Sequence, residues 1–367
     1  ENILPNMAAR LGLKTNNYNP FQGLSYEEME ATIRSGIYPA KTLIDYENWA
    51  AVESYILKLA PDSLPKINYP VFEEITGFKP RTLNLDGAPG ALITYLGFDQ
   101  EQKQLLTGYI TGKLMSYDAN ENKTIKEELF TRPIVDYILK EDKGYVTEIG
   151  KLDPTQLRSG RLLKLDNGMQ QVLIDSLHRP VHAVVEDPNG DGVPEFVISE
   201  FGDLRGSLSL FSQNPDGSLT KNNLLNQPGT IRVIPGDMNA DGKTDLVAQT
   251  TQGDESITIL YQQSDLVFKS EQVIRFSPVY GSSWFELADY DGDGDLDIIT
   301  VNGDNADKSY IPKPYHGLRI HINNGQNQFE EKYFFPLNGA TRLISGDYDQ
   351  DGDLDFFLVA TFPDYDR

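Results

Sequence analysis

Residues 289–297 read DYDGDGDLD, and the apolar run IITV follows directly at 298–301. Side-chain oxygens occupy positions 1, 3, 5 and 9 of this nine-residue stretch, and a glycine occupies position 6. The glycine allows a sharp backbone bend, so the four side chains and the carbonyl of position 7 can converge on one point. Such an oxygen cage suits a hard cation, and a single flexible loop with many ligands favours Ca²⁺ over Mg²⁺.

The same pattern, D-x-[DN]-x-D-G-x-x-[DE], occurs at 187–195, 237–245 and 347–355 as well. One copy could be a solvated turn, because Asp, Asn and Gly favour turns without any metal. Four copies predict about four Ca²⁺ sites. The predicted ligands, with position 7 contributing its carbonyl, are Asp187, Asn189, Asp191, Val193 and Glu195; Asp237, Asn239, Asp241, Lys243 and Asp245; Asp289, Asp291, Asp293, Asp295 and Asp297; and Asp347, Asp349, Asp351, Asp353 and Asp355.

The residues after each loop argue against an EF-hand. An EF-hand loop ends in a bidentate Glu at position 12. Here position 12 is Ile198, Ala248, Thr300 or Leu358, each inside a short apolar run. Runs of this length, rich in β-branched and aromatic residues, predict that a strand follows each loop.

The spacing of the loops predicts the fold. Their starts lie 50, 52 and 58 residues apart. Each repeat also holds an extended stretch before the loop, such as 181–185, and an alternating segment after it, such as 257–261. Turns such as 323–325 (NNG) then lead to a fourth short strand. Four antiparallel strands per repeat, without helices, predict a mainly β protein built of β-propeller blades.

These loops resemble the FG-GAP/VCBS repeats of bacterial surface proteins and integrin-like propellers, whose blades bind Ca²⁺ between their first two strands. The resemblance covers residues 175–367, the last blade being incomplete, and residues 66–174 are expected to form blades without the calcium loop. Because an unpaired sheet edge invites aggregation, we expect the natural chain to continue past Arg367 to about seven blades, or another chain to cover the edge.

Residues 1–65 have a different, helical character. Ser25 and Glu28 form a capping box that predicts a helix ending at Gly36, and Asp45 can cap a second helix that ends before Pro61. Residues 4–12, 24–29 and 55–65 resemble the C-terminal part of the small c-type cytochrome domain that precedes some bacterial propellers. That resemblance implies Met7 as a distal haem ligand. The cysteines of a haem attachment motif are absent, so we expect a cytochrome remnant and no haem in this chain.

Composition narrows the classes of function. The 367 residues carry a net charge of −23, which argues against nucleic acid as a partner. No apolar run is long enough to span a bilayer, and there are no cysteines. Signatures such as G-x-S-x-G and H-E-x-x-H are absent, and His178 and His182 are expected to be structural. We therefore expect a protein that is not an enzyme, with the long segment 302–317, including Lys313 and Tyr315, as a contact surface.

The resulting hypothesis is a calcium-binding propeller that acts as a binding or scaffolding subunit. We expect an exported, outer-membrane-associated protein at the bacterial surface or in the periplasm, with a lipid anchor possible upstream of Glu1. Its partner would be another protein or a glycan. Two alternatives stay open: an electron-transfer protein with a haem domain upstream, and a carbohydrate-binding or carbohydrate-active propeller.

Overall fold

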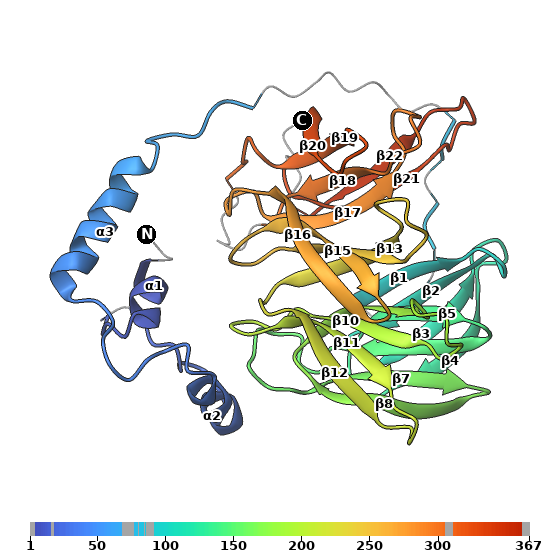
Figure 1. Ribbon diagram of the computed structural model, residues 1–367, viewed down its shortest axis with the longest axis horizontal. Coiled ribbons are helices and arrows are strands. Elements are labelled where there is room, and N and C mark those ends of the chain that lie inside the picture. Colours follow the sequence, from blue (N-terminus) through green and yellow to red (C-terminus); the bar gives the residue numbers. More distant parts are fainter. Residues whose placement is uncertain are drawn as a thin grey trace. The chain divides into compact units, whose positions relative to one another are not determined.

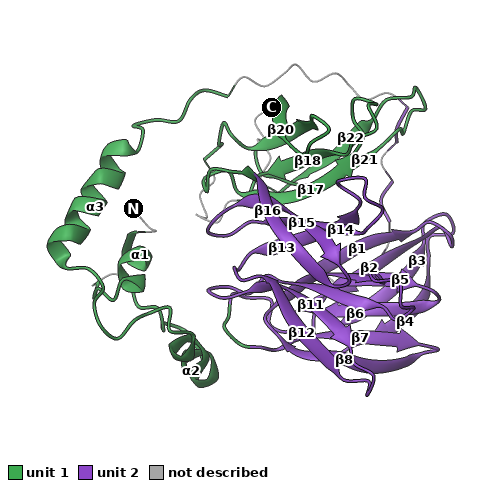
Figure 2. Ribbon diagram, in the orientation of Figure 1, with its two compact units in different colours: residues 1–69, 155–157, 274–367 green, residues 70–154, 158–273 purple. Residues whose placement is uncertain are grey.

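A computed structural model describes residues 4–15, 18–67, 77–79, 81–83, 85, 92–304 and 311–361. The chain divides into two compact units (Figure 2). The first comprises residues 1–69, 155–157 and 274–367, and the second comprises residues 70–154 and 158–273. Four-stranded antiparallel sheets dominate the described residues (Figure 1), so the predicted mainly β fold of propeller blades is confirmed.

In every four-stranded sheet, strands that are adjacent in the chain are adjacent in space. The first blade contains β1 (Ile93–Asp99), β2 (Gln104–Tyr109), β3 (Lys113–Asp118) and β4 (Lys123–Leu129). The second contains β5 (Ile134–Lys140), β6 (Lys143–Glu148), β7 (Gly160–Asp166) and β8 (Met169–Leu177). The third contains β9 (Pro180–Glu186), β10 (Glu195–Glu200), β11 (Ser207–Gln213) and β12 (Leu219–Leu225). The fourth contains β13 (Thr230–Gly236), β14 (Asp245–Thr250), β15 (Ser256–Ser264) and β16 (Val267–Arg275).

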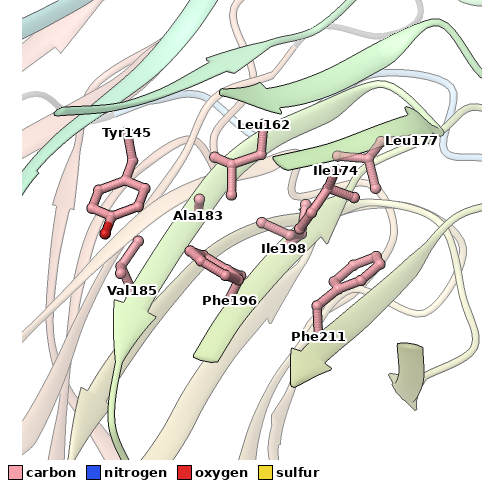
Figure 3. Close-up of a cluster of buried hydrophobic side chains, with 9 residues drawn as sticks. All are labelled: Tyr145, Leu162, Ile174, Leu177, Ala183, Val185, Phe196, Ile198 and Phe211. Carbon is pink, nitrogen blue, oxygen red and sulfur yellow. The ribbon is translucent and has the colours of Figure 1, made fainter. Parts of the chain in front are cut away.

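Apolar residues on alternate faces of each sheet hold neighbouring blades together. Ala183 and Val185 of β9 pack with Tyr145 and Leu162 of the second blade (Figure 3). Val184, between them in sequence, packs in another cluster with side chains of the fourth blade. Because side chains alternate across a strand, one blade can contribute to two cores at once.

The first unit contains a fifth blade and a two-stranded sheet. The blade consists of β17 (Ser282–Ala288), β18 (Asp297–Asn302), β19 (Gly317–Asn323) and β20 (Phe329–Pro336). Among the described residues, β21 (Ala340–Gly346) and β22 (Asp355–Ala360) form a sheet of two strands. Leu343 of β21 joins the apolar cluster that includes Ile299 and Ile320 of the fifth blade.

The described N-terminal residues, 4–15 and 18–67, include three helices: α1 (Leu4–Arg10), α2 (Tyr26–Ser35) and α3 (Tyr46–Leu59). The predicted capping box is present at Ser25, and Gly36 ends α2 with a φ of 68°. Asp45 caps α3, as predicted. Leu4 and Ala8 of α1 pack against Trp49 of α3, which gives these helices a small core of their own.

Candidate metal centres in the acidic loops

Each acidic loop joins the first two strands of a sheet: β9–β10, β13–β14, β17–β18 and β21–β22. The antiparallel register places position 9 opposite the residue that precedes position 1. The pairs are Glu195 with Glu186, Asp245 with Gly236, Asp297 with Ala288, and Asp355 with Gly346. The two ends of every loop therefore meet, so its acidic residues share a small volume.

The position 1 carboxylate organises each loop by accepting backbone hydrogen bonds. Asp237 accepts from Asp241 N–H at 3.1 Å and from Gly242 N–H at 2.8 Å. Asp187 and Asp347 make the equivalent bonds in their own loops, and Asp289 accepts from Gly292 and Gly294. Gly242 has a φ of 80°, a conformation that costs a residue with a Cβ atom, so the glycine at position 6 has the predicted role.

Two of the position 9 aspartates, Asp245 and Asp297, are buried where the loop meets the second strand, and Asp355 is partly buried. The two carboxylate oxygens of Asp297 accept from Tyr290 N–H and Asn323 N–H, both at 2.8 Å. Asp245 makes the same arrangement with Met238 and Gln262. Burial raises the pKa of Asp297, although these two hydrogen bonds lower it. The negative charges of the nearby Asp291 and Asp293 raise it further.

Three carboxylates converge in each of the two loops that have Asp at position 3. Ligand atoms of Asp289, Asp291 and Asp297 lie within 4.8 Å of one another, and so do those of Asp347, Asp349 and Asp355. Within the described residues, no ion pair joins these six carboxylates to a lysine or arginine. Such a group can hold a divalent cation, which would balance the shared negative charge.

The other two loops have Asn at position 3. In addition, the first of them has Glu195 at position 9, and the second has Lys243 at position 7. Glu195 is only 3% exposed, and its Oε2 atom has no hydrogen-bond partner. Burial raises the pKa of Glu195 to about 7, and Asp191 and Asp187 raise it as well. In the next loop, the ammonium of Lys243, a residue predicted to offer its carbonyl, pairs with Asp241 at 2.9 Å.

The remaining residues singled out in the sequence lie elsewhere. Met7 lies on α1 with 38% of its surface exposed. His178 accepts a hydrogen bond from Arg158 Nε at 3.0 Å, and burial lowers its pKa.

In the segment 302–317, residues 305–310 lie outside the described part. Lys313 is buried, so the prediction that it belongs to a contact surface is wrong. The ring of Tyr315 stacks on the ring of Tyr280, with 5.7 Å between the ring centroids.

Sequence reasoning missed a cavity in the two blades that lack the D-x-D-x-D-G pattern. Its volume is about 410 Å³, and the β1–β2 and β5–β6 hairpins line it. The turns read DQEQ at 99–102 and EDK at 141–143, and these acidic residues next to aromatic strands were the available signal.

The FG-GAP-like repeat family matches residues 187–248 and 237–300. The chain carries FG-GAP-like repeats. The matched residues contain three of the four acidic loops with the strands around them. No curated protein sequence matches the chain.

Several solved structures are similar to the chain at low identity. The β-propeller domain of Cps50 (Swd1) of Myceliophteria thermophila has 13% identity and a TM-score of 0.45, covering 73% of this chain and 84% of that one. The Pan2 WD40 domain of Neurospora crassa has 11% identity and a TM-score of 0.44, covering 69% and 68%. A chain of the Mitotic Checkpoint Complex has 11% identity and a TM-score of 0.46, covering 75% and 79%. None of the helices in the described ranges has the length and apolar character needed to cross a bilayer.

Proposed function

We propose that this FG-GAP-repeat protein is a non-enzymatic, calcium-dependent binding module whose acidic loops hold about four Ca²⁺ ions. The observation that carries the proposal is the convergence of Asp289, Asp291 and Asp297, and of Asp347, Asp349 and Asp355, within 4.8 Å. Carboxylates this close repel one another, and a divalent cation removes that cost. Because Ca²⁺ accepts six to eight oxygens in flexible geometry, it suits these loops better than Mg²⁺.

The first loop supports the proposal independently. The Oε2 atom of Glu195 is buried without a hydrogen-bond partner next to Asp187 and Asp191. Leaving a buried polar atom unsatisfied costs free energy. A cation bound by Glu195, Asp187 and Asp191 would satisfy this atom.

The proposed role of the ions is to hold rigid loops for a protein partner. Loops on a rigid scaffold commonly carry recognition, and the blades provide such a scaffold. Loops of this composition bind calcium with modest affinity, which suits the millimolar calcium outside cells. We therefore propose an exported, surface-associated scaffold rather than an intracellular one.

Thermal unfolding with and without calcium tests this proposal. Ligands that bind only the folded state stabilise it by mass action, by about 2.7 kcal/mol for one site at about 100 times its Kd. We expect millimolar Ca²⁺ to raise Tm over chelator-treated protein, and equal Mg²⁺ to raise it less. Terbium luminescence excited through Tyr290 and Tyr348, which lie at position 2 of their loops, gives a direct readout. Equal Tm values in chelator and calcium would contradict the proposal.

A further inference from the structure

The cavity of about 410 Å³ lies within the second unit, between the first two blades. Its walls come from β1, β2 and β5 and from the β1–β2 and β5–β6 turns. These turns connect the first and second strands of their blades, which is the position that the acidic loops occupy in the later blades. The short hairpins leave open the space beside the strands.

Three aromatic side chains line this cavity: Tyr95, Phe98 and Tyr137. The hydroxyl of Tyr95 donates a hydrogen bond to the carbonyl of Tyr137 at 2.9 Å, which joins the two blades. The Tyr137 ring lies over Gly144, where a Cβ atom would approach it to 2.9 Å. The tyrosine rings are therefore held against the strands, and Phe98 remains about half exposed. The cavity thus has a fixed aromatic wall.

Among the described residues that line the cavity, four are carboxylates, Asp99, Glu101, Glu141 and Asp142, and none is a lysine or arginine. Asp99 is held in its turn by hydrogen bonds from the N–H groups of Glu101 and Gln102, both at 2.9 Å. Lys140, directly before the second turn, binds Glu186 at 2.7 Å and the carbonyl of Val185 at 2.6 Å on β9, and neither Lys103 nor Lys143 is among the described lining residues. The described lining of the cavity therefore carries four carboxylates and no basic side chain.

We propose that this cavity binds an arginine or lysine side chain presented by an extended segment of a partner protein. Ionised carboxylates only accept hydrogen bonds, so the ligand must bring donors, and guanidinium or ammonium brings both donors and charge. The rings of Tyr137 and Phe98 offer a surface for the flat guanidinium or the aliphatic stem. A neutral sugar would also bring donors, but it carries no positive charge to balance the four carboxylates. The net charge of −23 would also attract a basic partner.

This inference rests on the proposed function as a protein-binding module, and it names the chemistry of the partner. The probe is a fluorescein-labelled glycine-serine peptide with one central arginine, compared with otherwise identical lysine and glutamine peptides. Fluorescence polarisation would measure binding to the full chain. We expect the arginine and lysine peptides to bind at least about tenfold more tightly than the glutamine peptide, and added salt to weaken them.

The variant pair Glu141→Gln/Asp142→Asn tests the site. It removes two charges and keeps the hairpin, because Asn tolerates the positive φ of 61° at position 142. The matched control is Glu271→Gln/Asp265→Asn, which removes two exposed charges on and before β16. We expect the first pair to weaken arginine-peptide binding by about tenfold or more and the control by less than about twofold.

Three results would overturn the inference: no binding preference for the basic peptides, equal losses in both variant pairs, or binding of a neutral oligosaccharide that these peptides do not displace. Each measurement is repeated with calcium and with chelator, alongside Tm. Calcium stabilisation without peptide binding would overturn only this inference. Peptide binding without calcium stabilisation would contradict only the proposed calcium sites.

Discussion

Gln262 Nε2 donates a hydrogen bond of 2.8 Å to the carbonyl of Pro188, which joins β15 of the fourth blade to the acidic loop of the third. The buried Gln262 side chain also accepts from Thr244 N–H at 3.1 Å, and the backbone N–H of Gln262 donates to the Asp245 carboxylate at 2.8 Å. A single residue therefore contacts the loops 187–195 and 237–245. The candidate metal centres in these two loops are therefore both held by Gln262.

Replacing this support should weaken both loops together. In Gln262→Ala, the carbonyl of Pro188 and the amide of Thr244 lose a buried partner, and we expect the free energy of unfolding to fall by about 1–3 kcal/mol. Calcium binding to both loops should weaken as well. Urea denaturation and calorimetric titration with Ca²⁺ measure the two effects. Gln263→Ala, at the exposed neighbour, is the control. A variant that matches the control in both measurements would contradict the coupling.

Asp291 and Asp297 should separate calcium binding from loop stability. Asp291 is exposed, whereas Asp297 is buried and accepts from two backbone N–H groups. In chelator, we expect Asp291→Ala to change the free energy of unfolding by less than about 0.5 kcal/mol and Asp297→Ala to lower it by about 1–3 kcal/mol. Both should lose part of the gain in Tm that calcium gives. An undiminished calcium gain in Asp291→Ala would count against this loop as a site.

Asp136 should make stability depend on pH. Burial raises its pKa from 3.8 to about 7, although Ala183 N–H and Tyr137 N–H donate to its carboxylate and Arg232 lowers the pKa too. Between these two values the folded protein keeps a proton that the unfolded chain has lost, so stability falls as pH rises through that window. Between about pH 5 and about pH 8, the free energy of unfolding of the wild type should fall by about 1–3 kcal/mol relative to that of Asp136→Asn. Urea denaturation of both proteins at each pH measures this. A difference that stays constant with pH would show that Asp136 is ionised throughout.

The local pattern of the sequence predicted the blades and the loop geometry. Position 1, position 6 and position 9 act within nine residues, so Asp237, Gly242 and Asp245 could be assigned from their spacing. The strands that follow were visible because buried β strands such as β10 and β14 read as short apolar runs.

Other features depend on residues far apart in the chain, and the sequence pattern did not predict them. Gln262 and Pro188 are 74 residues apart. The cavity beside Tyr95 and Tyr137 needs two blades to be packed together, and neither hairpin has a distinctive motif. Lys313 looked like a solvent-exposed residue of a long loop, but it is buried near Asn338, which accepts its N–H at 3.1 Å.

Arg319 is expected to be a main source of stability in the fifth blade. It is 3% exposed, and its guanidinium lies 4.4 Å from the ring centroids of both Tyr280 and Phe334. Nη1 donates to Asn302 and Nη2 to the carbonyl of Tyr315, each at 2.8 Å. The planar guanidinium therefore combines two ring contacts with two hydrogen bonds, an arrangement that the compact ammonium of lysine cannot reproduce.

Arg319→Lys should consequently be almost as damaging as Arg319→Ala. We expect each to lower the free energy of unfolding by about 2–4 kcal/mol, because the acceptors on Asn302 and Tyr315 lose buried partners. Glu331→Gln is the control, since Glu331 pairs with Arg319 at 3.2 Å from a half-exposed position and should cost less than about 1 kcal/mol. Urea denaturation gives the energies, and near-ultraviolet circular dichroism follows the tyrosines. Wild-type stability in Arg319→Lys would mean that positive charge alone, and not the planar guanidinium, supports this blade.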